Sequence, residues 1–369
     1  MQNNKSLISN DVELLELIVC DAANVTKQYQ PAPYWKKKSY RAARELVRYG
    51  LDGFRGTESG ISSSFGDNTL VNLRNAYRSG RIDSLKSALT KFPGFKQVFE
   101  AQVKLTEEFF RNELVYKNEY LWRSKRVQEL ISKYQILSMD TTRGGCVQFL
   151  EFDDLVISHH YLKLLDTLDV MLTEIDRTSL TGMTTLEIGG GFGVNTHLMI
   201  ELFGARKIVY LDISPNLYVG TQYLKSFYGT SVIDYRKSKN SPIRFQDDNS
   251  LEIFCILPHQ IENIKGDIDL FHNAHSFVEM SEPIVRNYAS KVNAMLSIDA
   301  GTAYLVSYDG FDPATTLNPE FLNSVFESSC MAKKVATLIP GRQDHHFCFS
   351  NFIKKSTPAT TSTNHFFGP

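Results

Sequence analysis

The second half of the chain alternates short apolar runs with helical stretches from Thr184 onward. Apolar runs of strand length occur at 184–189, 207–213, 251–257, 267–273 and 302–309. Helical stretches begin near residues 192, 216 and 281. Strands that alternate with helices predict parallel β-α-β units with right-handed crossovers. We therefore expect an α/β fold with a Rossmann-like, mostly parallel sheet.

The two ends of the chain differ from this pattern. The runs at 331–340 and 345–355 have no helix between them, which predicts an antiparallel hairpin that closes the sheet. Residues 10–137 are mostly helical, as shown by the spacing of Phe99, Val103, Phe110 and Leu114, and a Gly- and Ser-rich loop at 51–68 interrupts them. A short hairpin within 139–157 and a helix at 159–175 follow. The sequence thus predicts a mainly helical region over 1–157, an α/β domain over 158–355 and a flexible tail over 356–369.

Composition excludes several classes of protein. The 40 basic and 41 acidic residues nearly balance, and no segment is dense enough in Lys and Arg to track a phosphate backbone, so we expect no nucleic-acid partner. The five cysteines are odd in number and form no C-x-x-C pair, which indicates free thiols in a reducing compartment. No window of 18 apolar residues and no signal-peptide pattern occurs, so we expect a soluble, cytoplasmic protein.

A glycine-rich turn separates the first strand of this half from the helix that follows it. The turn contains Gly189, Gly190, Gly191 and Gly193. Glycines at such a junction let the backbone turn tightly and let a ligand lie against main-chain N–H groups at the helix N-terminus. The dinucleotide fingerprint requires a glycine where this chain has Val194, which weakens an NAD-binding interpretation.

The spacing resembles motif I of class I S-adenosylmethionine-dependent methyltransferases, E/D-x-G-x-G-x-G, with Glu187 in the acidic position. The resemblance implies S-adenosyl-L-methionine as the cofactor. Asp212 and Ile213 end the second strand, and a carboxylate at this place accepts the ribose hydroxyl protons. The alternative is an ordinary α/β turn in which Asp212 caps a helix.

Three further segments narrow the resemblance to one family of methyltransferases. The stretch 256–283, the stretch 31–55 and the closing run resemble sugar O-methyltransferases found in bacterial polysaccharide gene clusters. This implies a sugar or glycan acceptor, nucleotide-linked or lipid-linked, in surface polysaccharide assembly. It also places Pro258, His259 and Gln260 beside the adenine, although these residues also fit an ordinary strand end.

The residues after the fourth strand are the candidates for catalysis, because ligands of open α/β sheets bind at the carboxyl ends of strands. A sugar hydroxyl must lose its proton as it is methylated, so a general base is expected. If 275–279 is helical, His275 and Glu279 face the same way, and either one acts as the base. His272 is a third candidate, although it equally fits a histidine satisfied by backbone groups.

The family pattern N-x-x-S-F-x-E-M assigns Asn273 to the cofactor and Ser276 to the acceptor. We predict no metal, because Asp267 and Asp269 lie at the start of a strand, where a cap or turn role is expected. His345 and His346 are adjacent on a strand, so at most one of them reaches the site.

The helical region is expected to cover the crevice and bind the acceptor. Tyr34 and Trp35 are able to stack on a sugar ring, and Arg55 is able to grip a phosphate or carboxylate. Trp35 equally fits a core position. The sequence thus predicts a sugar O-methyltransferase of unknown oligomeric state; the alternatives are a methyltransferase for a carboxylate or amine, and a non-catalytic binding protein of the same fold.

Overall fold

The computed structural model describes residues 8–51, 53–55, 124–146, 149–152, 155–298, 301–308, 319–326, 330–336, 338 and 343–350. The predicted loop at 51–68 falls outside the described residues apart from 51 and 53–55. The helical spacing at 99–114 and the tail at 356–369 also lie outside them.

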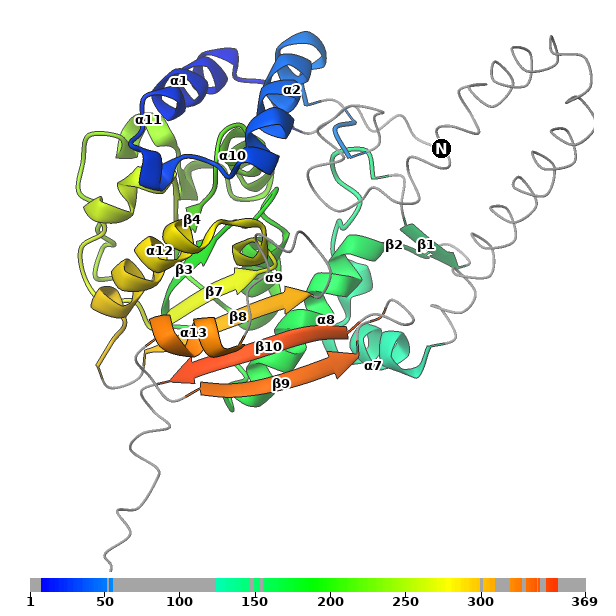
Figure 1. Cartoon of the computed structure of the whole chain (residues 1–369). Helices are drawn as coiled ribbons and strands as arrows, with labels where there is room; N and C mark the ends of the chain where they lie inside the picture. The colour runs from blue at the N-terminus through cyan, green and yellow to red at the C-terminus, as the bar shows by residue number, and fades with distance from the viewer. Residues whose placement is uncertain are drawn as a thin grey trace, which may run out of the picture.

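An eight-stranded sheet forms the centre of the molecule, in the order β5-β6-β4-β3-β7-β8-β10-β9 (Figure 1). Its strands are β3 (Thr184–Ile188), β4 (Lys207–Leu211), β5 (Val232–Ile233), β6 (Glu252–Ile256), β7 (Leu270–Ala274), β8 (Thr302–Tyr308), β9 (Cys330–Ala336) and β10 (Gln343–Ser350). All neighbours pair in parallel except β10, which is antiparallel to both β8 and β9. The α/β fold with an antiparallel closing hairpin is thereby confirmed.

The strand order reverses direction at β3, because β4 and β6 lie on one side of it while β7 and β8 lie on the other. In open α/β sheets this switch point is where ligands bind, at the carboxyl ends of the strands. The glycine turn follows β3 directly and so lies at this edge.

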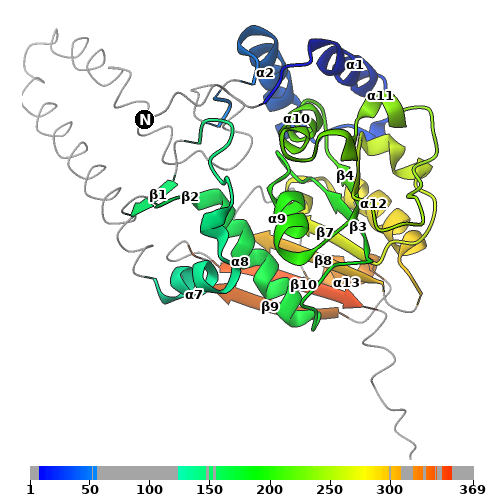
Figure 2. The same ribbon diagram turned by 180° about the vertical axis from the view of Figure 1, so that it is seen from behind.

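Helices cover both faces of the sheet. They are α1 (Val12–Ala23), α2 (Pro33–Tyr49), α7 (Lys125–Tyr134), α8 (His159–Glu174), α9 (Val194–Phe203), α10 (Asn216–Tyr228), α11 (Tyr235–Ser238), α12 (Glu282–Met295) and α13 (Pro319–Val325). The helices α8 and α9 lie over one face and α12 and α13 over the other (Figures 1 and 2), with a separate apolar core on each side. Among the described helices, none combines the length and the apolar character needed to cross a bilayer.

The amino-terminal helices share a core with the sheet. Leu14, Leu15 and Ile18 of α1 belong to the same apolar cluster as the buried side chains of α8, α9 and α10. Hydrogen bonds add to this contact, since the Asp11 N–H donates to the Tyr218 hydroxyl at 2.9 Å. The described residues of the predicted helical region over 1–157 are therefore packed on the α/β part. Most of their buried side chains belong to the core on the α8–α9 side, and Tyr29 belongs to the core on the other side.

A short antiparallel hairpin joins the two parts. It consists of β1 (Phe149–Phe152) and β2 (Leu155–Ser158), and α8 begins directly after it, as the sequence predicts. The sequence did not predict the two-residue edge strand β5.

We expect Leu15→Ala to lower the free energy of unfolding by about 2–5 kcal/mol, because Leu15 is buried in the shared core. Chemical denaturation followed by circular dichroism measures this change. Val12→Ala is the matched control, since Val12 lies on the same helix but is 49% exposed. A separate early transition that affects only part of the helical signal would contradict a shared core.

Candidate active site

The glycine turn adopts a conformation that few other residues tolerate. Gly189 and Gly191 have φ angles of +76° and +65°, in the left-handed region that favours glycine. A Cβ atom on Gly189 would lie 2.3 Å from the Ser276 hydroxyl oxygen. The turn therefore needs glycine both for its backbone angles and for its close contact with the segment after β7.

Asp212 lies beside this turn, at the end of β4. Its Oδ2 accepts a hydrogen bond from the Gly191 N–H at 2.8 Å, and its Oδ1 accepts from the Ile213 N–H at 2.7 Å. Burial raises the pKa of Asp212 to about 7, against the effect of the two backbone donors, which lower it. Each carboxylate oxygen has a further lone pair, so the group has the capacity to accept two more donors.

Glu187 supports the turn from the α9 side of the sheet. Its Oε2 accepts a hydrogen bond from the Thr196 hydroxyl at 2.6 Å and would lie 2.8 Å from a Cβ on Gly190. Its Oε1 lies 3.6 Å from Nδ1 of His272, and both side chains are almost fully buried. His272 is therefore enclosed in the core. Its strand position directs the side chain into the core, which does not favour the role of catalytic base, and that role stays a prediction.

The turn after β6 is stabilised by its own side chains. Gln260 is fully buried, and its Oε1 accepts from the Leu257 N–H at 2.9 Å. The side-chain oxygen of Gln260, which was predicted to lie beside adenine, thus already accepts a hydrogen bond from its own turn. Pro258 opens the same 3-10 turn (Pro258–Asn263). His259 is half-buried, and burial lowers its pKa.

Asn273 fastens the end of β7 to the end of β3. Its side-chain Nδ2 donates to the Ile188 carbonyl at 2.9 Å and to Ser276 Oγ at 2.6 Å, while its Oδ1 accepts from the Phe277 N–H at 3.1 Å. The Ser276 hydroxyl also donates to the Ile188 carbonyl, at 3.1 Å. These contacts make Asn273 and Ser276 structural supports of the site, a role that the sequence-based assignment to cofactor and acceptor did not foresee.

His275 pairs with a carboxylate from a distant strand. Its Nε2 lies 3.1 Å from Oδ2 of Asp344, which is 1% exposed at the start of β10. Its backbone has a φ of +69°, and its N–H donates to the Val306 carbonyl at 2.8 Å. The predicted helix over 275–279 is wrong: only a 3-10 turn at Phe277–Glu279 forms, so His275 and Glu279 are not on one helical face.

Glu279 instead joins two other elements. Its Oε2 accepts from the Trp35 indole N–H at 2.7 Å and its Oε1 from the Tyr308 hydroxyl at 2.9 Å. Burial raises the pKa of Glu279. The Tyr308 ring lies 5.5 Å from the His275 ring. Trp35 thus links α2 to the site through its N–H; the side chain of its predicted partner Tyr34 lies outside the described part of the structure.

Arg55 packs behind the glycine turn and has no open face. It is 1% exposed, donates to the Thr141 carbonyl at 2.8 Å and to Ser158 Oγ at 2.6 Å, and lies 4.9 Å from the Phe192 ring centre. The guanidinium group is thus hydrogen-bonded within the protein, and its predicted contact with an acceptor anion stays a prediction. The ring of His160 in α8 also stacks on the buried Phe192 ring, with 5.4 Å between the ring centres, and the sequence analysis missed this residue.

Asp269 and His346, two other polar residues considered in the sequence analysis, make hydrogen bonds away from the glycine turn. Asp269 accepts from the Thr184 N–H and the Ser297 hydroxyl, in the turn role expected at the start of β7. His346 is hydrogen-bonded to the Tyr304 hydroxyl on the neighbouring strand, and burial lowers the pKa of His346 to about 4. Within the described ranges, no group of three or more His, Cys, Asp or Glu residues is placed to hold a metal ion.

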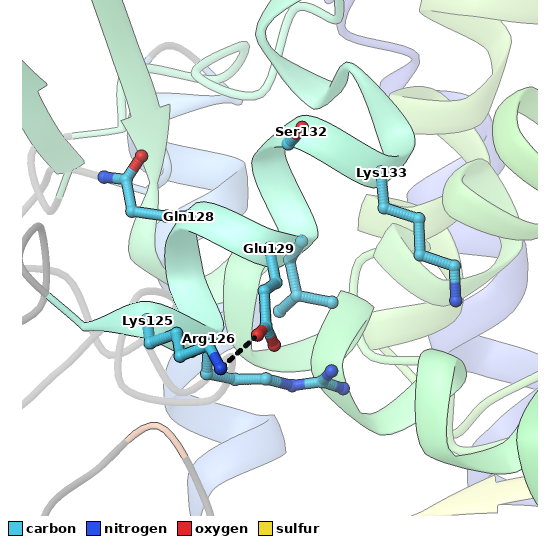
Figure 3. Close-up of a pocket in the computed structure, with 7 residues that line it drawn as sticks. Lys125, Arg126, Gln128, Glu129, Ser132 and Lys133 are labelled. Atoms are coloured by element: carbon cyan, nitrogen blue, oxygen red, sulfur yellow. Dashed lines mark ion pairs between the residues drawn. The ribbon is translucent and has the colours of Figure 1, made fainter.

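A separate hollow of about 600 Å³ lies along α7 (Figure 3). All its lining residues belong to this one helix, and Lys125 is paired with Glu129 at 3.6 Å within it. No residue of the glycine turn or of the β7 end contributes to it, so it is not part of the candidate site.

Comparisons with known proteins give structural likeness only. A scan against protein-family models finds no match, and neither does a search of curated proteins. Magnesium protoporphyrin IX methyltransferase from Synechocystis PCC 6803 with bound SAM is similar at a TM-score of 0.36 and 10% identity, over 52% of this chain and 79% of that one.

Two other solved structures resemble the chain. The N-methyltransferase NodS from Bradyrhizobium japonicum WM9 has a TM-score of 0.33 and 14% identity, over 50% of this chain and 96% of that one. A mutant of MtNAS in complex with S-adenosylmethionine has a TM-score of 0.38 and 12% identity, over 86% of this chain and 98% of that one. At such scores the description of the fold rests on this chain's own strand order.

We expect Asn273→Ala to lower the free energy of unfolding by about 2 kcal/mol or more, because it leaves the buried Ile188 carbonyl and Phe277 N–H with fewer partners. Thermal and urea denaturation measure this effect. Asn293→Ala is the matched control, since this helix residue makes one hydrogen bond far from the site, to the Val325 carbonyl. Equal stability of the two variants would show that Asn273 does not support the strand ends.

Proposed function

We propose that this protein is an S-adenosylmethionine-dependent O-methyltransferase whose general base is His275. The observation that carries the proposal is the juxtaposition of two features at one edge of the sheet. The glycine turn with Asp212 lies after β3 and β4, and the His275–Asp344 pair lies after β7. Asn273 and Ser276 connect the two features directly.

The residues of the turn fit the proposed cofactor. Left-handed Gly189 and Gly191 leave backbone rather than side chains at the edge where a ligand would approach. Asp212 is held beside Gly191 with the capacity to accept two ribose hydroxyl protons. S-adenosylmethionine supplies, when bound, a methyl group on a positively charged sulfur.

The His275–Asp344 pair fits a base that acts on the acceptor. We assign the Nε2–H of His275 as the donor to Asp344, so that Nδ1 is the nitrogen that accepts the proton of the acceptor hydroxyl. The Asp344 carboxylate then stabilises the imidazolium that forms. Proton removal by His275 makes the oxygen a better nucleophile as its bond to the methyl carbon forms.

Glu279 serves better as a positioning residue than as a second base. Both its oxygens already accept hydrogen bonds, one from Trp35 and one from Tyr308. It therefore holds the start of α2 over the end of β8, where Tyr308 lies against His275. This arrangement shields the reacting groups from water.

We propose a sugar hydroxyl as the acceptor. The support is the resemblance of the 256–283 and 31–55 segments to sugar O-methyltransferases, together with a base that an alcohol needs and a carboxylate acceptor does not. A role in surface polysaccharide assembly follows from the same resemblance. Methyl transfer to a carboxylate is the competing function, and loss of the base would leave it nearly unchanged.

The pKa of Asp212 predicts a pH-dependent affinity for S-adenosylmethionine. The ionised carboxylate accepts both hydroxyl protons. As the pH rises toward 7, the affinity should therefore increase by up to about 10-fold per pH unit, and above pH 7 it should level off. Isothermal titration calorimetry measures this dependence. Asp212→Asn should bind more weakly, with a flat profile between pH 5 and 8. A wild-type profile that is also flat would contradict the role of Asp212.

The same shift has a consequence for stability. The folded pKa of Asp212 lies above the unfolded value of 3.8, so the folded state holds a proton that the unfolded state loses. The contribution of this group to the free energy of unfolding therefore decreases as the pH rises from about 4 to 7. Asp212→Asn should remove that part of the slope.

His275→Ala should reduce kcat by about 10²–10⁴-fold without changing the affinity for S-adenosylmethionine, because the base acts on the acceptor. Asp344→Asn should also reduce kcat and shift the acid limb of the pH profile to lower pH, since the carboxylate favours the protonated ring. Release of S-adenosylhomocysteine across a panel of nucleotide sugars provides the assay. His345→Ala, beside Asp344 on β10, is the control; normal turnover by His275→Ala would assign the base elsewhere.

A further inference from the structure

The outer face of α2 concentrates positive charge. The helix has six basic residues and one acidic residue among 17, while the whole chain has a formal net charge of −1. The acidic residue, Glu45, is already paired with Arg41 at 3.2 Å. Lys38 lies 5.2 Å from the Trp35 ring centre, near the candidate site, whereas the proposed methyl transfer assigns no role to the other five cations.

Large apolar side chains lie exposed among the cations. Tyr40 is 74% exposed and Val47 is 63% exposed. They are seven residues apart and therefore lie one above the other on the helix. Ala42 and Leu46, which are 2% and 3% exposed, mark the opposite, buried side of α2.

Cations flank this apolar stripe on both sides. Lys36 lies along one side of it, and two rows with the same seven-residue spacing lie along the other. One row is Lys37 with Arg44 and the other is Arg41 with Arg48. All four residues are exposed, and Arg41 is also paired with Glu45. In both views α2 lies at the periphery of the molecule (Figures 1 and 2).

We propose that the outer face of α2 docks on the surface of an anionic lipid bilayer, with the helix parallel to the membrane plane. Tyr40 and Val47 would enter the boundary between headgroups and acyl chains, and the flanking cations would contact the lipid phosphates. A basic helix with a narrow apolar stripe is typical of such interfacial binding.

The side chains favour a bilayer over other anionic partners. A nucleic-acid backbone offers phosphates but no apolar layer for Val47. A stable protein interface needs a larger apolar centre than two side chains provide. The bilayer surface offers both components along the whole length of a helix.

This docking would also orient the candidate active site. Trp35, in the first turn of α2, is hydrogen-bonded to Glu279 beside His275 and Tyr308. A bilayer bound by the outer face of α2 would therefore lie on the same side of the molecule as Glu279 and the residues beside it. The inference goes beyond the proposed function, and methyl transfer to a water-soluble acceptor does not depend on it.

The test is co-sedimentation of the full-length chain with vesicles. Vesicles of phosphatidylcholine with phosphatidylglycerol should bind the protein, vesicles of phosphatidylcholine alone should bind it much more weakly, and added salt should reduce binding. Lys37→Glu combined with Arg44→Glu should lower the partition coefficient by at least about 10-fold. Tyr40→Ser combined with Val47→Ser should also lower it, because the apolar contribution is lost.

Lys125→Glu combined with Lys265→Glu is the matched control, since it makes the same change in net charge at exposed lysines outside α2. Normal circular dichroism and unchanged affinity for S-adenosylmethionine in all variants show that folding and the cofactor site are intact. An equal loss of vesicle binding in this control would overturn the proposal. So would equal binding of the full-length chain to neutral and anionic vesicles, or its binding to duplex DNA and not to vesicles.

Discussion

The hydrogen bonds between Asn273 and the end of β3 hold the two halves of the candidate site together. One buried amide takes the Ile188 carbonyl, the Ser276 hydroxyl and the Phe277 N–H as partners. Because Ile188 is the last residue before the glycine turn and Ser276 follows His275, the amide sets the distance between the two halves of the candidate site. Gly189 allows this arrangement, since a side chain there would occupy the place of Ser276.

The antiparallel strand β10 supplies what the parallel strands cannot. Parallel strands all end at the edge where ligands bind, whereas an antiparallel strand begins there. Asp344, the second residue of β10, therefore reaches the edge at which β7 and β8 end, and it meets His275 there. Its register partner on β8 is Tyr308, which in turn binds Glu279. The closing hairpin thus completes the sheet and also brings Asp344 to the residue that the proposed function uses as the base.

Local sequence patterns predicted the sheet well and the side-chain partners poorly. The helices expected near 192, 216 and 281 begin at Val194, Asn216 and Glu282, because apolar periodicity and glycine signals act over a few residues. The Asp344 partner lies 69 residues from His275 along the chain, and no local pattern encodes such a contact. The same limit applies to Trp35, whose partner Glu279 is 244 residues away.

Backbone direction separates the buried His272 from the partly exposed His275 near the end of β7. His272 lies within the strand, and the alternation of side chains turns it toward Glu187 in the core on the α9 side. His275 lies just past the strand, where a φ of +69° breaks the alternation and leaves its side chain 13% exposed beside Asp344. A left-handed conformation at a residue other than glycine costs about 1–2 kcal/mol and persists where surrounding contacts enforce it. Here the contacts are the His275 N–H bond to Val306 and the Asn273 bond to Phe277, so the strain lies at the residue that the proposed chemistry needs.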